Sequence, residues 1–306
     1  MSESAGLAAR KAALSIFSQV LRQRRPLDAQ LETLKALPPR DAGFARALAS
    51  QTLRHFGVLD AVIRQFVAKP LAPHKAGPAT EILLLGACEL LILKVPPHAA
   101  VDAANRLAQA DGKAVHFKSL INAVLRRVAR DGDGVRAGLD GARLNTPDWL
   151  WSRWSVQYGD DTARAIAEAH GKEAPLDITL KNKEAVHPDS TPLIGLSRRV
   201  EAQGRIEEMP GFADGDWWVQ DVAASLPVTL LGDVAGKRVI DLCAAPGGKS
   251  LQLAARGAEV TAVERDPARA ARIGENLART GLKANVIESD ARDFHGTAPL
   301  VLMDAP

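Results

Sequence analysis

The chain has 306 residues, 46% hydrophobic and 25% charged, and a formal net charge of +3. This is the composition of a globular protein of about two domains, and it excludes the fibrous and disordered classes. No apolar run reaches the roughly 20 residues of a membrane-spanning helix, and the two cysteines, Cys88 and Cys243, are too few for a disulfide framework.

The first part of the chain, residues 1–135, is predicted to form an all-α domain. Apolar residues recur at helical spacing in five segments: residues 8–21, 41–67, 78–95, 101–110 and 117–128. The third of these is apolar on most sides of its helix, so the other helices must bury it. We therefore expect a compact helical bundle around this segment.

Charge is unevenly distributed along the chain. Residues 1–133 hold 19 Lys and Arg against 11 Asp and Glu, whereas residues 134–306 hold 20 against 25. A basic front half is typical of a protein that binds a polyanion such as RNA. Charge alone leaves equally open the alternative that these residues only solubilise helix faces.

The composition changes after the helical segments. Residues 131–148 are rich in Gly, Asp and Pro, which indicates a domain boundary, and residues 136–235 are predicted to form a linker and a small α+β region. Within this region the pattern predicts two helices and two strands, over residues 151–170, 223–231, 176–181 and 217–220, respectively.

All five tryptophans of the chain lie in this middle region: Trp149, Trp151, Trp154, Trp217 and Trp218. Such side chains stack on RNA bases in some RNA-binding proteins. More often they pack where two domains meet. We expect the second role here.

Strands and helices alternate from residue 236 onward. Four apolar strands are predicted over residues 239–242, 260–263, 284–287 and 300–303, and helices over residues 249–255 and 267–277. Alternation of this kind is typical of a parallel sheet with right-handed crossovers. Residues 236–306 therefore predict the N-terminal half of a Rossmann-like α/β domain.

Acidic residues stand at or near the ends of the four predicted strands: Asp241, Glu264, Asp290 and Asp304. Ligands of open α/β sheets bind beyond the carboxyl ends of the strands, where a carboxylate after the second strand suits the two hydroxyls of a ribose. An aspartate after the third strand can accept a hydrogen bond from an adenine amino group. The glycine turn after the first strand lets the backbone approach such a ligand closely. The pattern predicts a pocket for an adenosine with a non-phosphate tail.

Two common cofactors contain adenosine, NAD and S-adenosyl-L-methionine. NAD requires a Gly-x-Gly-x-x-Gly turn that holds its pyrophosphate at a helix N-terminus. Residues 244–249 read Ala-Ala-Pro-Gly-Gly-Lys and do not match that turn. We therefore expect S-adenosyl-L-methionine.

These residues also carry a resemblance to a known family. The run Asp-Leu-Cys-Ala-Ala-Pro-Gly-Gly-Lys over residues 241–249, with Glu264, Asp290 and the Asp-Ala-Pro of residues 304–306, resembles the Sun/RsmB family of RNA cytosine-5 methyltransferases. The helical front half is similar to the NusB-like RNA-binding domain of bacterial members. Val219-Gln220-Asp221 resembles the family's segment that leads into the methyltransferase fold, whereas Ile178-Thr179-Leu180-Lys181 departs from the expected Leu-Arg-Val-Asn.

The resemblance implies both a fold and a function. The fold is an incomplete α/β Rossmann-like class I methyltransferase domain, preceded by an all-α NusB-like domain. The function is S-adenosyl-L-methionine-dependent methylation of carbon 5 of a cytosine in RNA, of the 16S ribosomal type. We expect a monomer whose partner is RNA. Because the N-terminus lacks a basic segment followed by an apolar core, we also expect a cytoplasmic protein that does not bind membranes.

The predicted cofactor-binding residues are those of the glycine turn and three of the acids: Cys243, Ala244, Ala245, Pro246, Gly247, Gly248, Lys249, Glu264, Asp290 and Asp304. The histidines are scattered without ligand spacing, so no metal site is predicted.

The resemblance also implies how the reaction proceeds. A cysteine thiolate adds to carbon 6 of cytosine, which makes carbon 5 electron-rich enough to attack a methyl group, and a second cysteine assists elimination. The resemblance places both cysteines after Pro306, so we expect a C-terminally truncated member with no catalytic residue in this chain. Cys243 belongs to the cofactor turn, and Cys88 lies in an apolar helix.

Two other functions stay open at this stage. The first is a protein that binds RNA and cofactor without catalysis. The second is a nucleic-acid methyltransferase that acts on an exocyclic amine. Enzymes of that class usually carry Asn/Asp-Pro-Pro-aromatic where this chain has Asp-Ala-Pro at residues 304–306.

Overall fold

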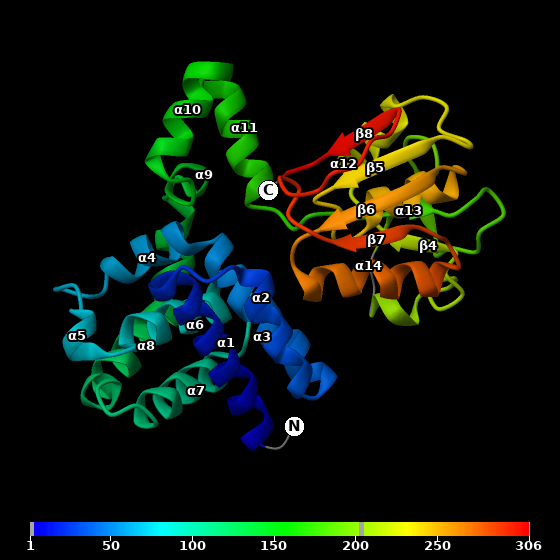
Figure 1. Ribbon diagram of the computed structural model, residues 1–306. Coiled ribbons are helices and arrows are strands. Elements are labelled where there is room, and N and C mark those ends of the chain that lie inside the picture. Colours follow the sequence, from blue (N-terminus) through cyan, green and yellow to red (C-terminus); the bar gives the residue numbers. More distant parts are fainter. Residues whose placement is uncertain (1–2, 202–204, 306) are drawn as a thin grey trace. The chain divides into compact units, whose positions relative to one another are not determined.

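The structure is a computed structural model that describes residues 3–201 and 205–305, with side chains from residue 6 onward. The chain divides into two compact units, Met1–Glu173 and Ala174–Pro306, which we call the helical unit and the sheet unit (Figure 1). Among the described residues, no helix combines the length and the apolar character needed to cross a membrane.

The helical unit is all-α, as predicted. Its helices are α1 (Glu3–Gln23), α2 (Leu27–Leu31), α3 (Pro39–Arg54), α4 (Phe56–Arg64), α5 (Pro73–Ala76), α6 (Ala79–Leu91), α7 (Pro97–Gln109), α8 (Lys118–Ala137), α9 (Gly141–Leu144), α10 (Asp148–Tyr158) and α11 (Asp160–His170), with 3₁₀ turns at Glu32–Ala36 and Ala114–Phe117. Helix α6 is buried along almost its whole length and packs against α1, α3, α4, α7 and α8. The apolar segment is therefore the centre of the bundle, as its sequence required.

The apolar helix carries two buried glutamates, Glu81 and Glu89, and one closely packed glycine. Glu89 accepts a hydrogen bond of 3.0 Å from Arg10 Nε of α1, although burial raises the pKa of Glu89. At Gly86, a Cβ atom would lie 2.6 Å from Leu125 Cδ1 of α8. Glu89 and Gly86 thus serve contacts with neighbouring helices rather than breaking the helix.

The structure places the boundary between the units later than the composition indicated. Helix α8 continues to Ala137 through Gly132, which packs closely against Leu91 and Val128, so a glycine here marks close packing and not a helix end. Helices α9 to α11 belong to the helical unit. The predicted helix over residues 151–170 is two helices, because Gly159 has a positive φ of 82° between them.

The sheet unit begins with an antiparallel sheet of order β2-β3-β1-β4. Its strands are β1 (Leu176–Leu180), β2 (Ser190–Pro192), β3 (Ser197–Val200) and β4 (Trp217–Val219), with a 3₁₀ turn at Ile206–Glu208, and α12 (Val222–Leu230) follows. Strands β1, β4 and helix α12 match the predicted segments, whereas β2 and β3 were not predicted.

The second sheet is parallel and has the order β7-β6-β5-β8. Its elements are β5 (Arg238–Leu242), α13 (Gly248–Ala255), β6 (Glu259–Glu264), α14 (Pro267–Thr280), β7 (Asn285–Glu288) and β8 (Leu300–Met303). This confirms the predicted Rossmann-like half, in which the chain leaves β5 in one direction and returns to its other side with β8.

The tryptophans do not form one group. Trp217 is buried in the core of the antiparallel sheet, so the predicted place at a domain seam is wrong for it. Trp218 is buried against residues of the parallel-sheet region, where the predicted middle region meets the Rossmann-like half. Trp151 lies against the guanidinium groups of Arg143 and Arg164 in the helical unit. In the same unit Trp154 packs edge-on against His170, and Trp149 is 67% exposed.

Candidate functional site

A cavity of about 410 Å³ opens in the sheet unit beside the carboxyl ends of β5 and β8. Seven of the predicted cofactor-binding residues line it: Cys243, Ala244, Ala245, Pro246, Gly248, Lys249 and Asp304. Parallel strands end at one edge of their sheet, which brings the turn after β5 next to the segment after β8. Pro306 of the predicted Asp-Ala-Pro run lies outside the described residues.

The turn after β5 has the backbone shape that its glycines allow. Gly247 has a φ of 105° and donates its N–H to the carbonyl of Ala244 at 2.9 Å. A Cβ atom on Gly247 would lie 3.3 Å from Ile273 Cγ2 of α14. Helix α13 starts directly after Gly247 without a side-chain cap, so the positive end of its dipole stands at the turn, where it favours an anionic group.

Asp241 is a buried carboxyl group at the floor of this cavity. It is 1% exposed and accepts a hydrogen bond of 2.6 Å from Ser250 Oγ of α13. Burial raises the pKa of Asp241 to about 6, although the Ser250 hydrogen bond and the charge of Lys249 act in the opposite direction. The site thus holds a carboxyl group that a positively charged ligand would stabilise in its ionised form.

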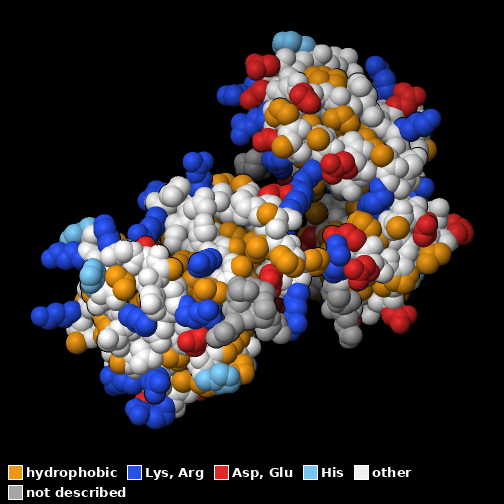
Figure 2. Space-filling view, turned by 90° about the horizontal axis from the view of Figure 1, so that it is seen from below, with side chains coloured by type: hydrophobic (Ala, Val, Ile, Leu, Met, Phe, Trp, Pro, Cys, Tyr) orange, Lys and Arg blue, Asp and Glu red, His pale blue; other side chains and the backbone are white. Residues whose placement is uncertain are grey.

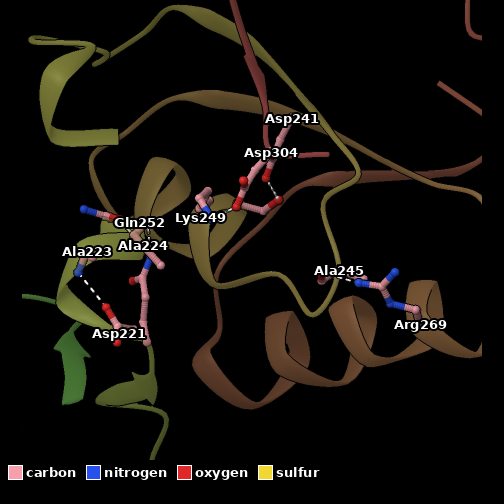
Figure 3. Close-up of polar contacts among 11 residues, drawn as sticks. Asp221, Ala223, Ala224, Asp241, Ala245, Lys249, Gln252, Arg269 and Asp304 are labelled. Carbon is pink, nitrogen blue, oxygen red and sulfur yellow. Dashed lines mark hydrogen bonds and ion pairs between the residues drawn. The ribbon is translucent and has the colours of Figure 1, made fainter. Parts of the chain in front are cut away.

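Lys249 and Asp304 form an ion pair across the cavity, with 2.6 Å between Nζ and Oδ2. Figure 3 shows the two side chains meeting close to Asp241. The Lys249 side chain is 15% exposed and that of Asp304 is 64% exposed. The pair therefore has one end packed in the protein and one end open to solvent.

Glu264, at the end of β6, supports the turn but does not line the cavity. Its carboxylate is 3% exposed and accepts the backbone N–H groups of Ala245 at 3.3 Å and Asp266 at 3.1 Å. Arg269 of α14 donates to the carbonyl of Ala245 at 3.0 Å and lies 3.9 Å from Glu264 (Figure 3). Glu264, which was predicted to bind the ribose, is thus hydrogen-bonded to the glycine turn itself.

Asp290 also lies outside the cavity lining. Its carboxylate accepts hydrogen bonds from the side chain of Arg292, at 3.0 and 2.8 Å, and from the Arg292 backbone N–H at 2.9 Å. These bonds hold the pKa of Asp290 well below its usual range. An adenine amino group would have to share this carboxylate with Arg292.

Seven lining residues were absent from the predicted cofactor-binding residues: Val219, Gln220, Asp221, Ala224, Asp241, Arg269 and Ala305. Gln220 is buried and accepts a bond of 3.0 Å from Trp218 Nε1, while its own Nε2 donates to Gln252 Oε1 at 3.0 Å. This amide chain ties the segment after β4 to helix α13. In the sequence, the position of Gln220 was indicated only by the resemblance of residues 219–221 to the family's segment that leads into the methyltransferase fold.

The two cysteines have different surroundings. Cys243 is half-buried, has a positive φ of 58° and lines the cavity as part of the turn. Cys88 is buried in α6, and burial raises the pKa of its thiol to about 12. Within residues 3–201 and 205–305, no group of three or more His, Cys, Asp or Glu side chains is arranged to hold a metal ion.

The chemistry of this cavity fits the two ends of S-adenosyl-L-methionine. Asp221 and Asp241 offer carboxylates to its sulfonium and ammonium charges, and the N-terminus of α13 with Arg269 offers positive charge to its carboxylate. The apolar methyl groups of Ala244 and Ala245 form part of the wall between them.

Comparison with protein families agrees with both units. The NusB family matches residues 7–130, and the family described as 16S rRNA methyltransferase RsmB/F matches residues 228–306.

Individual proteins match nearly the whole chain. Ribosomal RNA small subunit methyltransferase B of Vibrio cholerae is 32% identical over 302 residues, which cover 92% of this chain and 69% of that protein. Its counterpart in Xanthomonas campestris is 31% identical over 329 residues, covering 99% and 73%. The crystal structure of PH0851 has a TM-score of 0.71 at 17% identity and covers 100% of this chain and 75% of that one, which shows a shared fold.

Proposed function

Because this chain belongs to the RsmB family of small-subunit ribosomal RNA methyltransferases, we propose that it serves methylation of carbon 5 of a cytosine in 16S ribosomal RNA. The family uses S-adenosyl-L-methionine, which supplies a methyl group on a positively charged sulfur. The observation that supports carbon 5 is the residue that follows Asp304 after β8: it is Ala305, where an amine methyltransferase usually carries the first proline of an Asn/Asp-Pro-Pro-aromatic run.

The glycine turn, Asp221, Asp241 and Arg269 hold the cofactor in this proposal. The turn brings backbone N–H groups close to the ligand because Gly247 and Gly248 have no side chains. Asp241 places a buried negative charge near the sulfonium, and Arg269 and the start of α13 face the carboxylate. Glu264 fixes the turn by its two backbone hydrogen bonds and serves the ribose through its remaining lone pairs.

Asp304 orients the target base in the same proposal. Its carboxylate is exposed at the cavity, where it can accept a hydrogen bond from the exocyclic amine of a cytosine. Lys249 holds that carboxylate in place from the packed side of the pair. Neither Cys243 nor Cys88 serves as the nucleophile, since the first is part of the cofactor turn and the second is buried in the helical unit.

The test is made on ribosomal RNA from cells. We expect disruption of the gene for this chain to convert one cytosine of 16S ribosomal RNA from resistant to sensitive in bisulfite sequencing. Complementation with the intact gene should restore resistance, and so should the control variant Asp293→Asn, an exposed carboxylate outside the cavity lining. Asp304→Asn should not restore it.

Nucleoside mass spectrometry separates the alternatives. Loss of 5-methylcytidine supports the proposal, whereas loss of a nucleoside methylated on an exocyclic amine would replace it with the amine methyltransferase. An unchanged set of methylated nucleosides would leave only the binding function.

A further inference from the structure

The helical unit contains a cavity of about 710 Å³ between α1, α3 and α7 that the proposed function does not use. Leu7, Phe44 and Ala103 give it apolar walls, and Arg40 and Arg106 bring positive charge to its lining. A cavity of this size holds a small ligand, and apolar walls with a few polar groups are typical of such sites.

One carboxylate in this cavity is buried without a partner. Asp41, the third residue of α3, is 8% exposed and lines the cavity. Across residues 3–201 and 205–305, its side chain has no hydrogen bond and no ion pair, whereas the neighbouring Arg10 is fully engaged by Glu89. The Asp41 oxygens are not among the fully buried side-chain atoms that lack a partner, so they face the cavity. A ligand there that donates hydrogen bonds would replace water at this carboxylate.

We infer that this cavity binds one unstacked guanine nucleotide of RNA, with Asp41 accepting two hydrogen bonds from the base. Guanine presents adjacent N1–H and N2–H groups, which match the two oxygens of one carboxylate. Adenine and cytosine each place a ring acceptor beside their amino group, and uracil has a single N–H between two carbonyls. Proteins that read RNA sequence bind such splayed bases on their Watson–Crick edges and stack them on aromatic or guanidinium planes.

The charge around the cavity favours a nucleic acid as the source of this base. Arg40 is exposed and has no ion pair in the described part of the chain, and Arg106 forms an ion pair with Asp102 at 3.9 Å. Figure 2 shows more Lys and Arg than Asp and Glu side chains on the visible face of the helical unit, at lower left. Phosphate groups on either side of a bound nucleotide would meet these cations. The inference takes RNA as the ligand from the proposed function, but it concerns a separate unit and a separate site.

The experiment measures binding of the four ribonucleoside 5′-monophosphates to the full chain by calorimetry at low salt. Saturating S-adenosylhomocysteine keeps adenine nucleotides out of the cavity of the sheet unit. We expect guanosine monophosphate to bind on the order of 10- to 100-fold more tightly than the other three, as two hydrogen bonds to a charged group imply. Asp41→Asn presents one acceptor and one donor, a pair that an edge of each of the four bases can match, so it should lose the guanine preference.

Two further variants keep the result interpretable. Asp102→Asn removes an exposed carboxylate from the same lining and should leave the order of the four nucleotides unchanged. Arg40→Gln should weaken the binding of all four nucleotides by a similar factor and keep the guanine preference. This variant tests the inference even if Asp41→Asn does not fold. Equal binding of all four nucleotides by the unaltered chain would overturn the inference. An equal gain in affinity for every nucleotide in both Asp41→Asn and Asp102→Asn would also overturn it, because removal of one negative charge would then explain the change in binding. Binding of S-adenosylhomocysteine should stay constant throughout, so failure here is distinct from failure of the methyltransferase site.

Discussion

The ammonium group of Lys249 lies 2.6 Å from the carboxylate of Asp304, and this pair joins the start of helix α13 to the segment after β8. The two residues are 55 positions apart in the sequence and meet because β5 and β8 are neighbours in the parallel sheet. A residue of the glycine turn thereby holds an acidic side chain that lines the cavity and is 64% exposed.

Lys249→Met should abolish methylation with little loss of stability. Because Asp304 is largely exposed, the pair contributes only about 0–1 kcal/mol to the free energy of unfolding. The cell-based bisulfite measurement should show an unmethylated cytosine, while urea denaturation shows a nearly unchanged midpoint. Lys237→Met, which changes an exposed lysine before β5, is the matched control and should keep methylation. Full methylation in Lys249→Met would contradict the assigned role.

The stability of the protein should fall as the pH rises from about 4 to about 6 because of Asp241. Its pKa is raised from 3.8 to about 6 in the folded chain, so between these values the folded state binds more protons than the unfolded state. Protonated Asp241 stabilises the folded state fully below the unfolded-state pKa of 3.8. This contribution, up to roughly 3 kcal/mol in the free energy of unfolding, is lost as the pH rises through the folded-state pKa of about 6. Urea denaturation at several pH values should show this slope, and Asp241→Asn should reduce it. An identical slope in the variant would assign it to other groups.

The same carboxyl group predicts a pH dependence of cofactor affinity. A positively charged sulfonium stabilises ionised Asp241, so the affinity for S-adenosyl-L-methionine should rise as the pH increases through about 6. S-adenosylhomocysteine has no sulfonium charge and should show a smaller rise. Calorimetry with both ligands at pH 5 to 8 checks the difference. Parallel curves for the two ligands would place Asp241 away from the sulfur.

Only one of the two cysteines should react readily with a thiol reagent. Cys88 is buried and burial raises its thiol pKa to about 12, so very little thiolate is present at pH 8. Cys243 is half-buried beside the cavity and should label first. Mass spectrometry should find one fast label, slowed by S-adenosylhomocysteine and absent from Cys243→Ser. A labelling rate that the ligand does not change would count against the cofactor cavity.

Glu264→Ala should weaken cofactor binding by roughly 1.5–3 kcal/mol, the range for hydrogen bonds that involve a charged group. The variant also leaves the N–H groups of Ala245 and Asp266 without their acceptor. Glu264→Gln keeps one side-chain oxygen for these groups and should bind with intermediate affinity. Calorimetry on folded protein decides, and equal affinity in the alanine variant would remove Glu264 from the binding residues.

The buried amide chain should behave as one unit. Gln220→Ala and Gln252→Ala each leave a buried partner unsatisfied, at a cost of about 1–3 kcal/mol in the free energy of unfolding. The double variant should cost less than the sum, with a coupling of about 0.5–3 kcal/mol. Gln157→Ala, on the exposed face of α10, should cost little. Strict additivity in urea denaturation would show that the two amides act independently.

The parallel sheet was predictable because its strands are short apolar runs that alternate with helical segments, and β8 was predicted with its observed bounds. Strands β2 and β3 were missed because they are three and four residues long and carry Ser, Thr, Pro and Arg. Strand β2 pairs with β3, and β3 also pairs with β1, which lies before both in the chain. Runs this short are too brief for an alternating pattern to predict them as strands.

The site was predictable in the same uneven way. The turn after β5 is contiguous, so its residues could be named from the sequence. Asp221 and Arg269 come to the cavity from α12 and α14 through tertiary packing. Glu264 and Asp290 were named from their strand ends, but their carboxylates are held by backbone groups and by Arg292, which strand position does not reveal.

The order β7-β6-β5-β8 also determines when the site can exist during synthesis. The ribosome delivers β5 and the glycine turn first, then β6 and β7, which extend the sheet on one side only. A nascent chain that has reached Glu288 has the turn and three strands, but the other edge of β5 is bare and Lys249 has no acidic partner. The last described strand fills that edge and brings Asp304 with it. Binding of the cofactor to this cavity would therefore stabilise chains in which β8 has paired with β5.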